Sequence, residues 1–101
     1  MAVTNYRALQ ALTAATDLSK GYGLGVVINA SGDAALPAAG KPIVGTIIET
    51  APQGETLGVC CEQGVKSAAR VSAAVVAGAA LSVGADGRFA TAATGNAIVG
   101  Y

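Results

Sequence analysis

The feature that most constrains the fold of this chain is an internal repeat. Shifted by 55 positions, residues 23–46 (GLGVVINASGDAALPAAGKPIVGT) lie over residues 78–101 (GAALSVGADGRFATAATGNAIVGY) without a gap, and nine of the 24 aligned pairs are identical. The identical glycines fall where turns need them, and Ile-Val-Gly ends both copies in the same register. We therefore expect two copies of one small structural unit. A chain this rich in Ala and Gly could also produce such matches by coincidence.

Both copies have the local pattern of a β-hairpin. Each begins with a β-rich run, continues through a turn whose glycine tolerates positive φ, and ends in a second short run before Ile-Val-Gly. Asp86-Gly87, between apolar runs, is the strongest hairpin signal in the chain. The first runs are Val26–Ile28 and Leu81–Val83, and the turns are 30–33 and 85–88.

The segment between the two copies also reads as short strands. Residues 46–49 favour a strand, and residues 51–54 form a turn with Pro second and Gly fourth. Residues 56–62 alternate, which places Leu57, Val59 and Cys61 on one face. Short strands separated by turns every 8–12 residues predict an all-β fold, a small β-barrel or sandwich, for a single domain over residues 21–101.

Two segments do not follow this pattern. Residues 1–20 contain Tyr6, Leu9 and Leu12 at helical spacing, and we expect an extended or partly helical N-terminal arm outside the main fold. Residues 67–77 (SAARVSAAVVA) have a helix cap and a terminating glycine, yet they are short and rich in β-branched side chains. Helix and strand both remain open for this second segment.

Composition argues against several classes of partner. Six basic and six acidic residues give a formal net charge of zero and form no basic run, whereas nucleic-acid binding needs clustered Lys and Arg. No stretch approaches the ~20 apolar residues that span a bilayer, and the first 20 residues lack a signal-peptide pattern. We therefore expect no nucleic acid and no membrane as partner, and a chain that is synthesised in a cytoplasm.

The chain also lacks the residues that most catalytic and metal sites need. There is no histidine, which removes the commonest general base and metal ligand. The adjacent Cys60 and Cys61 have no zinc-ligand spacing. Gly40-Lys41 ends a stretch that departs from the phosphate-binding loop at Ala35 and Pro42. We predict no catalytic residue, no metal, no cofactor and no enzymatic activity, so a small enzyme or nucleotide-binding module is the least supported reading.

Aromatic side chains are scarce, so each one is a candidate anchor in the core or at an interface. The sequence alone does not decide between these two roles for Tyr6, Tyr22, Phe89 and Tyr101. We expect partner contacts from the N-terminal arm and from two of the other tyrosines. These candidate residues are Asn5, Tyr6, Arg7, Leu9, Tyr22 and Tyr101.

Four segments, in this order, resemble the phage capsid cement proteins, also called head decoration proteins. They are TDLSKGYGLGVVINASGD (16–33), PIVGTIIETAPQGETLGV (42–59), QGVKSAARV (63–71) and VVAGAALSVGADGRFATAATGNAIVG (75–100). The resemblance covers about residues 13–101. Its most specific parts are I-V-G…A-P-x-G-E over Ile43–Glu55 and V-x-A-D-G-R over Val83–Arg88.

This resemblance implies a small β-rich protein on the outer surface of an assembled phage head, with no catalytic residues. The implied partners are the major capsid protein and copies of the same chain, for which we expect a trimer, with a dimer as the alternative. Residues 1–20 would then be an arm that lies over neighbouring capsid subunits. The implied role is to stabilise the capsid lattice within the virion.

The sequence departs from the family pattern at its last residue. Family chains commonly continue after I-V-G-Y with a further strand, whereas the sequence here stops at Tyr101. Either the sheet closes with one strand fewer, or a neighbour supplies the strand. We predict that Tyr101 packs in or beside an intersubunit contact. A β-module of a phage tail, baseplate or fibre is the alternative function, because the same composition fits it.

Overall fold

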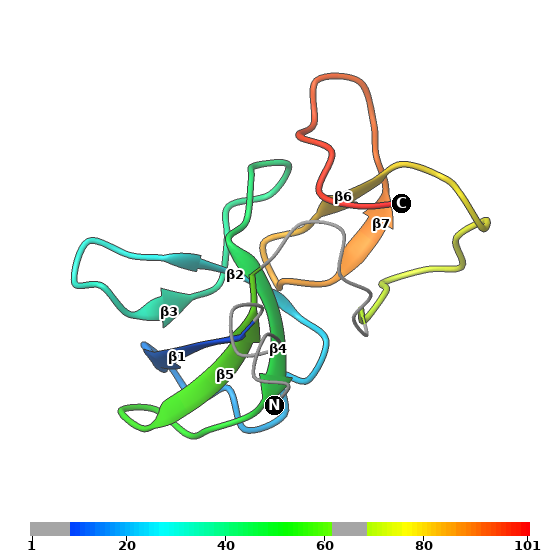
Figure 1. Cartoon of the computed structure of the whole chain (residues 1–101). Coiled ribbons are helices and arrows are strands. Elements are labelled where there is room, and N and C mark those ends of the chain that lie inside the picture. Colours follow the sequence, from blue (N-terminus) through cyan, green and yellow to red (C-terminus); the bar gives the residue numbers. More distant parts are fainter. Residues whose placement is uncertain (1–8, 62–68) are drawn as a thin grey trace, which may run out of the picture.

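The computed structural model of the protein describes residues 9–61 and 69–101, and every regular element in these ranges is a β-strand (Figure 1). Five strands form one antiparallel sheet in the order β1-β5-β4-β2-β3, and β6 pairs with β7 in a separate hairpin. The predicted all-β fold is confirmed. The strands are β1 (Leu9–Thr13), β2 (Gly25–Ile28), β3 (Ala34–Ala35), β4 (Gly45–Glu49), β5 (Thr56–Cys60), β6 (Leu81–Val83) and β7 (Phe89–Thr91).

The five-stranded sheet curls but does not close into a barrel. A single parallel bridge between Ala14 and Ala34 joins its two edges, with the Ala15 amide donating to the Ala34 carbonyl at 2.8 Å. A register shift between Ile47 and Glu49 of β4 adds to the twist, because a bulge bends the strand that carries it. We call this sheet with its connections, residues 9–61, the first lobe, and residues 69–101 the second lobe.

The core of the molecule lies within the first lobe. Val26, Ile47, Leu57 and Val59 have at most 1% of their surface exposed. Cys61 packs against the edge of this cluster, so the predicted alternation along residues 56–62 is confirmed as far as residue 61. Gly45 is required where β4 crosses β5, because a Cβ there would collide with the Cys60 carbonyl oxygen. Two adjacent strands can therefore approach closely at this point.

The internal repeat is present in the hydrogen bonding as well as in the sequence. Each copy forms a hairpin, β2–β3 in the first lobe and β6–β7 in the second, and the third segment of each copy returns along the first strand. Three strand pairings of the first copy recur in the second with a shift of 55: Val27–Ala35 as Ser82–Ala90, Ile28–Ala34 as Val83–Phe89, and Val26–Gly45 as Leu81–Gly100. One hydrogen bond recurs in the same way. The Val44 amide donates to the Val26 carbonyl and the Val99 amide donates to the Leu81 carbonyl, both at 2.9 Å.

A further strand-like contact joins the chain before each hairpin to that hairpin. In the first lobe Ala14 forms a parallel bridge to Ala34, and in the second Val71 forms one to Phe89. Ala34 and Phe89 are counterparts, whereas Val71 lies 57 residues after Ala14, so the preceding segment reaches the equivalent strand position without keeping the shift of 55. The predicted pseudo-repeat is confirmed, and each lobe contains one copy.

Main-chain hydrogen bonds hold the two lobes together. The Gly25 amide donates to the Gly87 carbonyl at 2.8 Å, and the Gly40 amide donates to the Val83 carbonyl at 2.8 Å. Val83 is 2% exposed, since its side chain packs toward Gly25 and Ile43. A Cβ at Gly87 would lie 2.9 Å from the Gly25 carbonyl oxygen. The tip of the β6–β7 hairpin is thus fitted against the first lobe.

The structure differs from expectation near the start of the described chain. Residues 9–13 form β1 at the edge of the sheet, and Ala14 and Leu18 belong to the core, so this part of the expected arm lies within the fold. Pairing with β5 overrides the helical spacing of Leu9 and Leu12. Residues 1–8 lie outside the described residues.

Residues 69–77, the described part of 67–77, form neither a helix nor a regular strand. Their only strand-like contact within the described residues is the bridge at Val71. Residues 97–99 form no regular strand: Ile98 is 49% exposed, and the bridge next to them in the described part of the chain joins Leu81 to Gly100. No strand in the described residues lies beside this segment as β5 lies beside β4.

Candidate interaction surfaces

The charged side chains of the described residues build turns and form no reactive cluster. In these ranges no three His, Cys, Asp or Glu residues lie close enough to hold a metal ion. Asp86 accepts the Arg88 amide at 3.0 Å and its Nε at 2.7 Å, within the β6–β7 turn. These bonds, first from the amide and then from the guanidinium, hold the pKa of Asp86 below its usual value. Both side chains are about half exposed, so this ion pair belongs to a solvated turn and contributes little to stability.

The turn of the first hairpin is built without a titrating group. The side-chain oxygen of Asn29 accepts the Ser31 amide at 3.0 Å and the Asp33 amide at 2.9 Å. An amide oxygen therefore performs in the first lobe the role that a carboxylate performs in the second. Asp17 is bonded in the same local manner to Ser19, whose hydroxyl and amide lower the pKa of Asp17.

The two adjacent thiols are free and only partly accessible. Cys61 donates weakly to Gln10 Oε1 at 3.4 Å. Burial, followed by the neighbouring Cys60, raises the pKa of Cys61. Because the thiolate is the nucleophilic form, a raised pKa makes Cys61 less reactive. The environment of these residues suits small packing side chains.

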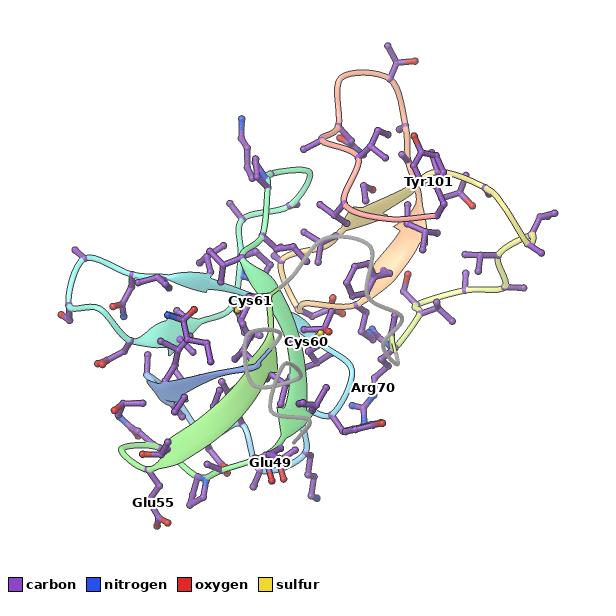
Figure 2. All side chains as sticks on the ribbon, viewed as in Figure 1. Glu49, Glu55, Cys60, Cys61, Arg70 and Tyr101 are labelled. Atoms are coloured by element: carbon purple, nitrogen blue, oxygen red, sulfur yellow. The ribbon has the colours of Figure 1, made fainter. Side chains whose placement is uncertain are left out.

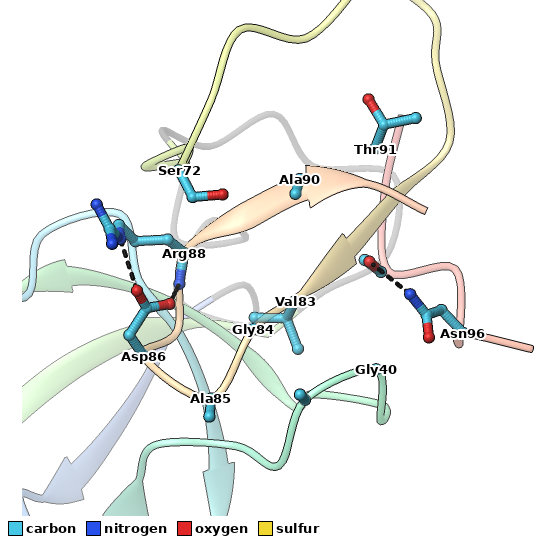
Figure 3. A pocket seen from close by; sticks show the side chains of 12 residues that line it. Gly40, Ser72, Val83, Gly84, Ala85, Asp86, Arg88, Ala90, Thr91 and Asn96 are labelled. Carbon is cyan, nitrogen blue, oxygen red and sulfur yellow. Dashed lines mark hydrogen bonds and ion pairs between the residues drawn. The ribbon is translucent and has the colours of Figure 1, made fainter. Parts of the chain in front are cut away.

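An open groove runs along the second lobe beside the loop that carries Gly40 (Figure 3). Its cavity volume is about 620 Å³. At one wall Asn96 Nδ2 donates to Ser82 Oγ at 3.2 Å, and at the other the Asp86–Arg88 pair closes on itself. The remaining lining is mainly small side chains, including Ala39, Ala85 and Ala90. The groove is therefore a shallow surface of small side chains with a few polar groups, and its lining contains no nucleophile paired with a base.

The predicted partner residues that the structure describes are Leu9, Tyr22 and Tyr101, and they are divided between the two lobes. Tyr22 precedes β2 in the first lobe and is 51% exposed. Tyr101 is 81% exposed and lies beside the β6–β7 hairpin (Figure 2). Phe89 is 3% exposed and is therefore a core residue. Leu9 lies in β1, while Asn5, Tyr6 and Arg7 lie outside the described residues. The described candidates therefore do not form one cluster.

Sequence reasoning missed a set of exposed aliphatic side chains. All ten residues of 69–78 are exposed, and none of the eight after Arg70 is charged. The β-branched content of this segment was the available signal, but it does not reveal exposure. Seven large aliphatic side chains in the described residues are at least 36% exposed: Ile28, Leu36, Val44, Val71, Val75, Val76 and Ile98.

Nothing in the described residues has the form of a membrane-spanning helix. Comparison of the chain with models of protein families gave no match. Comparisons with curated proteins and with solved structures gave none either. The candidate surfaces are therefore interpreted from their own chemistry and from the sequence pattern.

Proposed function

We propose that this protein is a structural virion protein, a capsid cement or decoration protein that binds the outer surface of a phage head. The observation that carries the proposal is the ordered set of segments that resembles this family. Its two most specific parts lie at defined places in the fold. Ile43–Glu55 contains β4 and the turn that follows it, and Val83–Arg88 contains the β6–β7 turn.

The surface chemistry supports a protein that acts by binding. The exposed aliphatic side chains and the two exposed tyrosines are the kind of groups that become buried at protein interfaces. The formal net charge of zero gives little repulsion between copies that are packed side by side. The reactive groups that an enzyme would use are few, which is why we propose a role without catalysis.

The proposed mechanism is stabilisation by mass action over a repeated lattice. A protein that binds the assembled shell, and binds free capsid subunits less tightly, shifts the equilibrium toward the shell. Each site contributes RT ln(1 + [L]/Kd), where [L] is the free concentration of the protein and Kd its dissociation constant on the shell. Many equivalent copies add these small contributions. The proposed partners are the major capsid protein and other copies of this chain. The chain would be made in the host cytoplasm and reside on the outside of the capsid.

The test is a comparison of phage heads with and without this protein. Heads that carry it should retain DNA to a higher temperature and through a stronger osmotic shock than heads that lack it. Equal retention in both samples would contradict the proposal. A low-resolution map of the particle would then show whether the protein lies on the head or on a tail, baseplate or fibre.

A further inference from the structure

The contact between the two lobes has an unused counterpart on the surface of the molecule. The β6–β7 tip presents the Gly87 carbonyl to the Gly25 amide of the first lobe. Shifted by 55 residues, this pair becomes the Gly32 carbonyl and the Ala80 amide. Neither group has a main-chain hydrogen-bond partner in the described part of the chain. The counterparts of one donor and one acceptor of the lobe contact are therefore both present, but they are not bonded to each other.

The apolar side chains of the contact are repeated in the same way. Val83 is 2% exposed, and its Cγ2 lies close to Gly25, beside which Ile43 also packs. Its counterpart in the first lobe, Ile28, is 43% exposed. The counterpart of Ile43 in the second lobe, Ile98, is 49% exposed. The two side chains that the repeated contact would cover are thus both exposed.

The two surfaces that correspond to the lobe contact, the β2–β3 tip and the second-lobe surface around Ala80, are not covered by the described part of the chain. A Cβ built on Gly32 would have no atom within 4 Å, whereas one on Gly87 would meet the first lobe. The first hairpin therefore projects freely. On the second lobe, Gly95, the counterpart of Gly40, also has no main-chain donor or acceptor bond in the described residues.

We propose that copies of this chain associate head to tail through this repeated contact. The β2–β3 turn of one copy, with Gly32 and Ile28, docks on the second lobe of the next copy, at Ala80 and Ile98. The occupant is a second copy because the molecule itself shows, between its lobes, which element covers such a surface. A contact between two different surfaces is heterologous, so it continues from copy to copy or closes into a ring.

The repeated contact differs in one detail from the internal one. Where the first lobe has Gly25, the second has Ala80, and a Cβ on Gly25 would lie 3.0 Å from Ile43 Cδ1 and 3.2 Å from Val83 Cγ2. Ile28 is also one methylene larger than Val83. The copies should therefore sit a few tenths of an ångström further apart than the lobes. Ile98 can adapt, because it is half exposed.

This inference deepens the self-association in the proposed function, and its test needs no capsid. Purified full-length protein is examined by sedimentation over a range of concentrations. The average mass of the wild type should rise with concentration. Ile28→Asp and Ile98→Asp should each remain monomeric, because each places a charge in one half of the contact. Gln53→Asp is the matched control, since Gln53 is exposed in the turn between β4 and β5, outside the contact, and this variant should associate like the wild type.

The decisive sample is an equimolar mixture of the two variants. Ile28→Asp keeps an intact second-lobe surface and Ile98→Asp keeps an intact hairpin, so the mixture should form heterodimers and stop there. A monomeric wild type, unchanged association of either variant, or a mixture without heterodimers would overturn the inference. Circular dichroism checks folding, and Ile28→Thr and Ile98→Thr replace any variant that does not fold. Two outcomes distinguish this inference from the proposed function. If the protein binds phage heads but stays monomeric in solution, only this inference fails. If it associates in solution but does not bind heads, only the proposed function fails.

Discussion

The two lobes of this protein share a hydrogen-bond register and differ in how much they bury. In the first lobe β5 lies against β4, and Val26, Ile47 and Val59 are fully buried. In the second lobe no described strand takes the place of β5, and burial centres on Val83 and Phe89. The turns determine the strand register in both copies, whereas the strand that lies alongside each copy determines how deeply its side chains are buried. Equivalent positions in the two lobes therefore serve as controls for one another.

The largest expected difference lies at the glycine that ends each Ile-Val-Gly. A Cβ at Gly45 would collide with the backbone of β5, while one at Gly100 would meet nothing within 4 Å. We expect Gly45→Ala to destabilise the protein by roughly 3 kcal/mol or more, since the backbone must move. Gly100→Ala should change stability by at most about 0.5 kcal/mol. Urea unfolding of both variants checks this, and equal midpoints would contradict the difference in packing.

The glycines of the two hairpin tips should show a smaller difference. Gly32 and Gly87 have φ of 84° and 81°, so alanine at either position costs about 1 kcal/mol of backbone strain. Only at Gly87 would the Cβ also press on the other lobe. We expect Gly87→Ala to lose about 1–2 kcal/mol more than Gly32→Ala. Chemical denaturation of the two variants measures this excess, and its absence would mean that the lobes do not hold the tip tightly.

Truncation at the lobe contact should separate Val83 from Ile28. Val83→Ala removes buried methyl groups and should cost about 2 kcal/mol. Ile28→Ala acts on a side chain that is 43% exposed, and in dilute monomeric protein it should cost less than about 1 kcal/mol. Thermal unfolding at low protein concentration gives the comparison. Equal losses would indicate that Ile28 is covered by part of the same chain.

The smallest expected effect is a difference in pH dependence between the two turns. The pKa of Asp86 is lowered in the folded state, so its contribution to stability is complete above the unfolded value of about 4 and is lost as the pH falls through the lower folded value. Asp86→Asn should therefore flatten the acid limb of stability slightly. Asn29→Ala should weaken its turn equally at all pH values. Melting temperatures between neutral and acid pH test both, and a parallel acid limb in Asp86→Asn would argue against the role of this carboxylate.

The sequence predicts the locally determined parts of the fold best. The turns at Gly32, Gly54 and Gly87 are located correctly, because positive φ at glycine is a property of a few neighbouring residues. The spacing of 55 also predicts the equivalence of the hairpins. β1 is missed, since Leu9 and Leu12 have helical spacing and only the distant β5 makes them a strand.

The surface is less predictable than the fold, for the same physical reason. Exposure depends on which elements lie opposite, so the sequence does not reveal that Ile98 is 49% exposed while its counterpart Ile43 packs beside Gly25. The exposure of Tyr22 and Tyr101 agrees with a role at an interface, but it does not identify the partner. For residues 67–77 the sequence leaves both helix and strand open, and the exposure of the described part, 69–77, does not follow from those residues alone.

The pairing of β1 with β5 also has a kinetic consequence. Leu9 pairs with Cys60, so the edge of the first sheet joins residues about fifty positions apart. Closing a loop of this length costs chain entropy before the strand contacts that offset the cost can form, so a high contact order slows folding. On the ribosome, β1 must wait until β5 has emerged, while the β6–β7 hairpin closes within about a dozen residues. We expect the second lobe to form its hairpin quickly and to dock on a first lobe whose completion sets the folding rate.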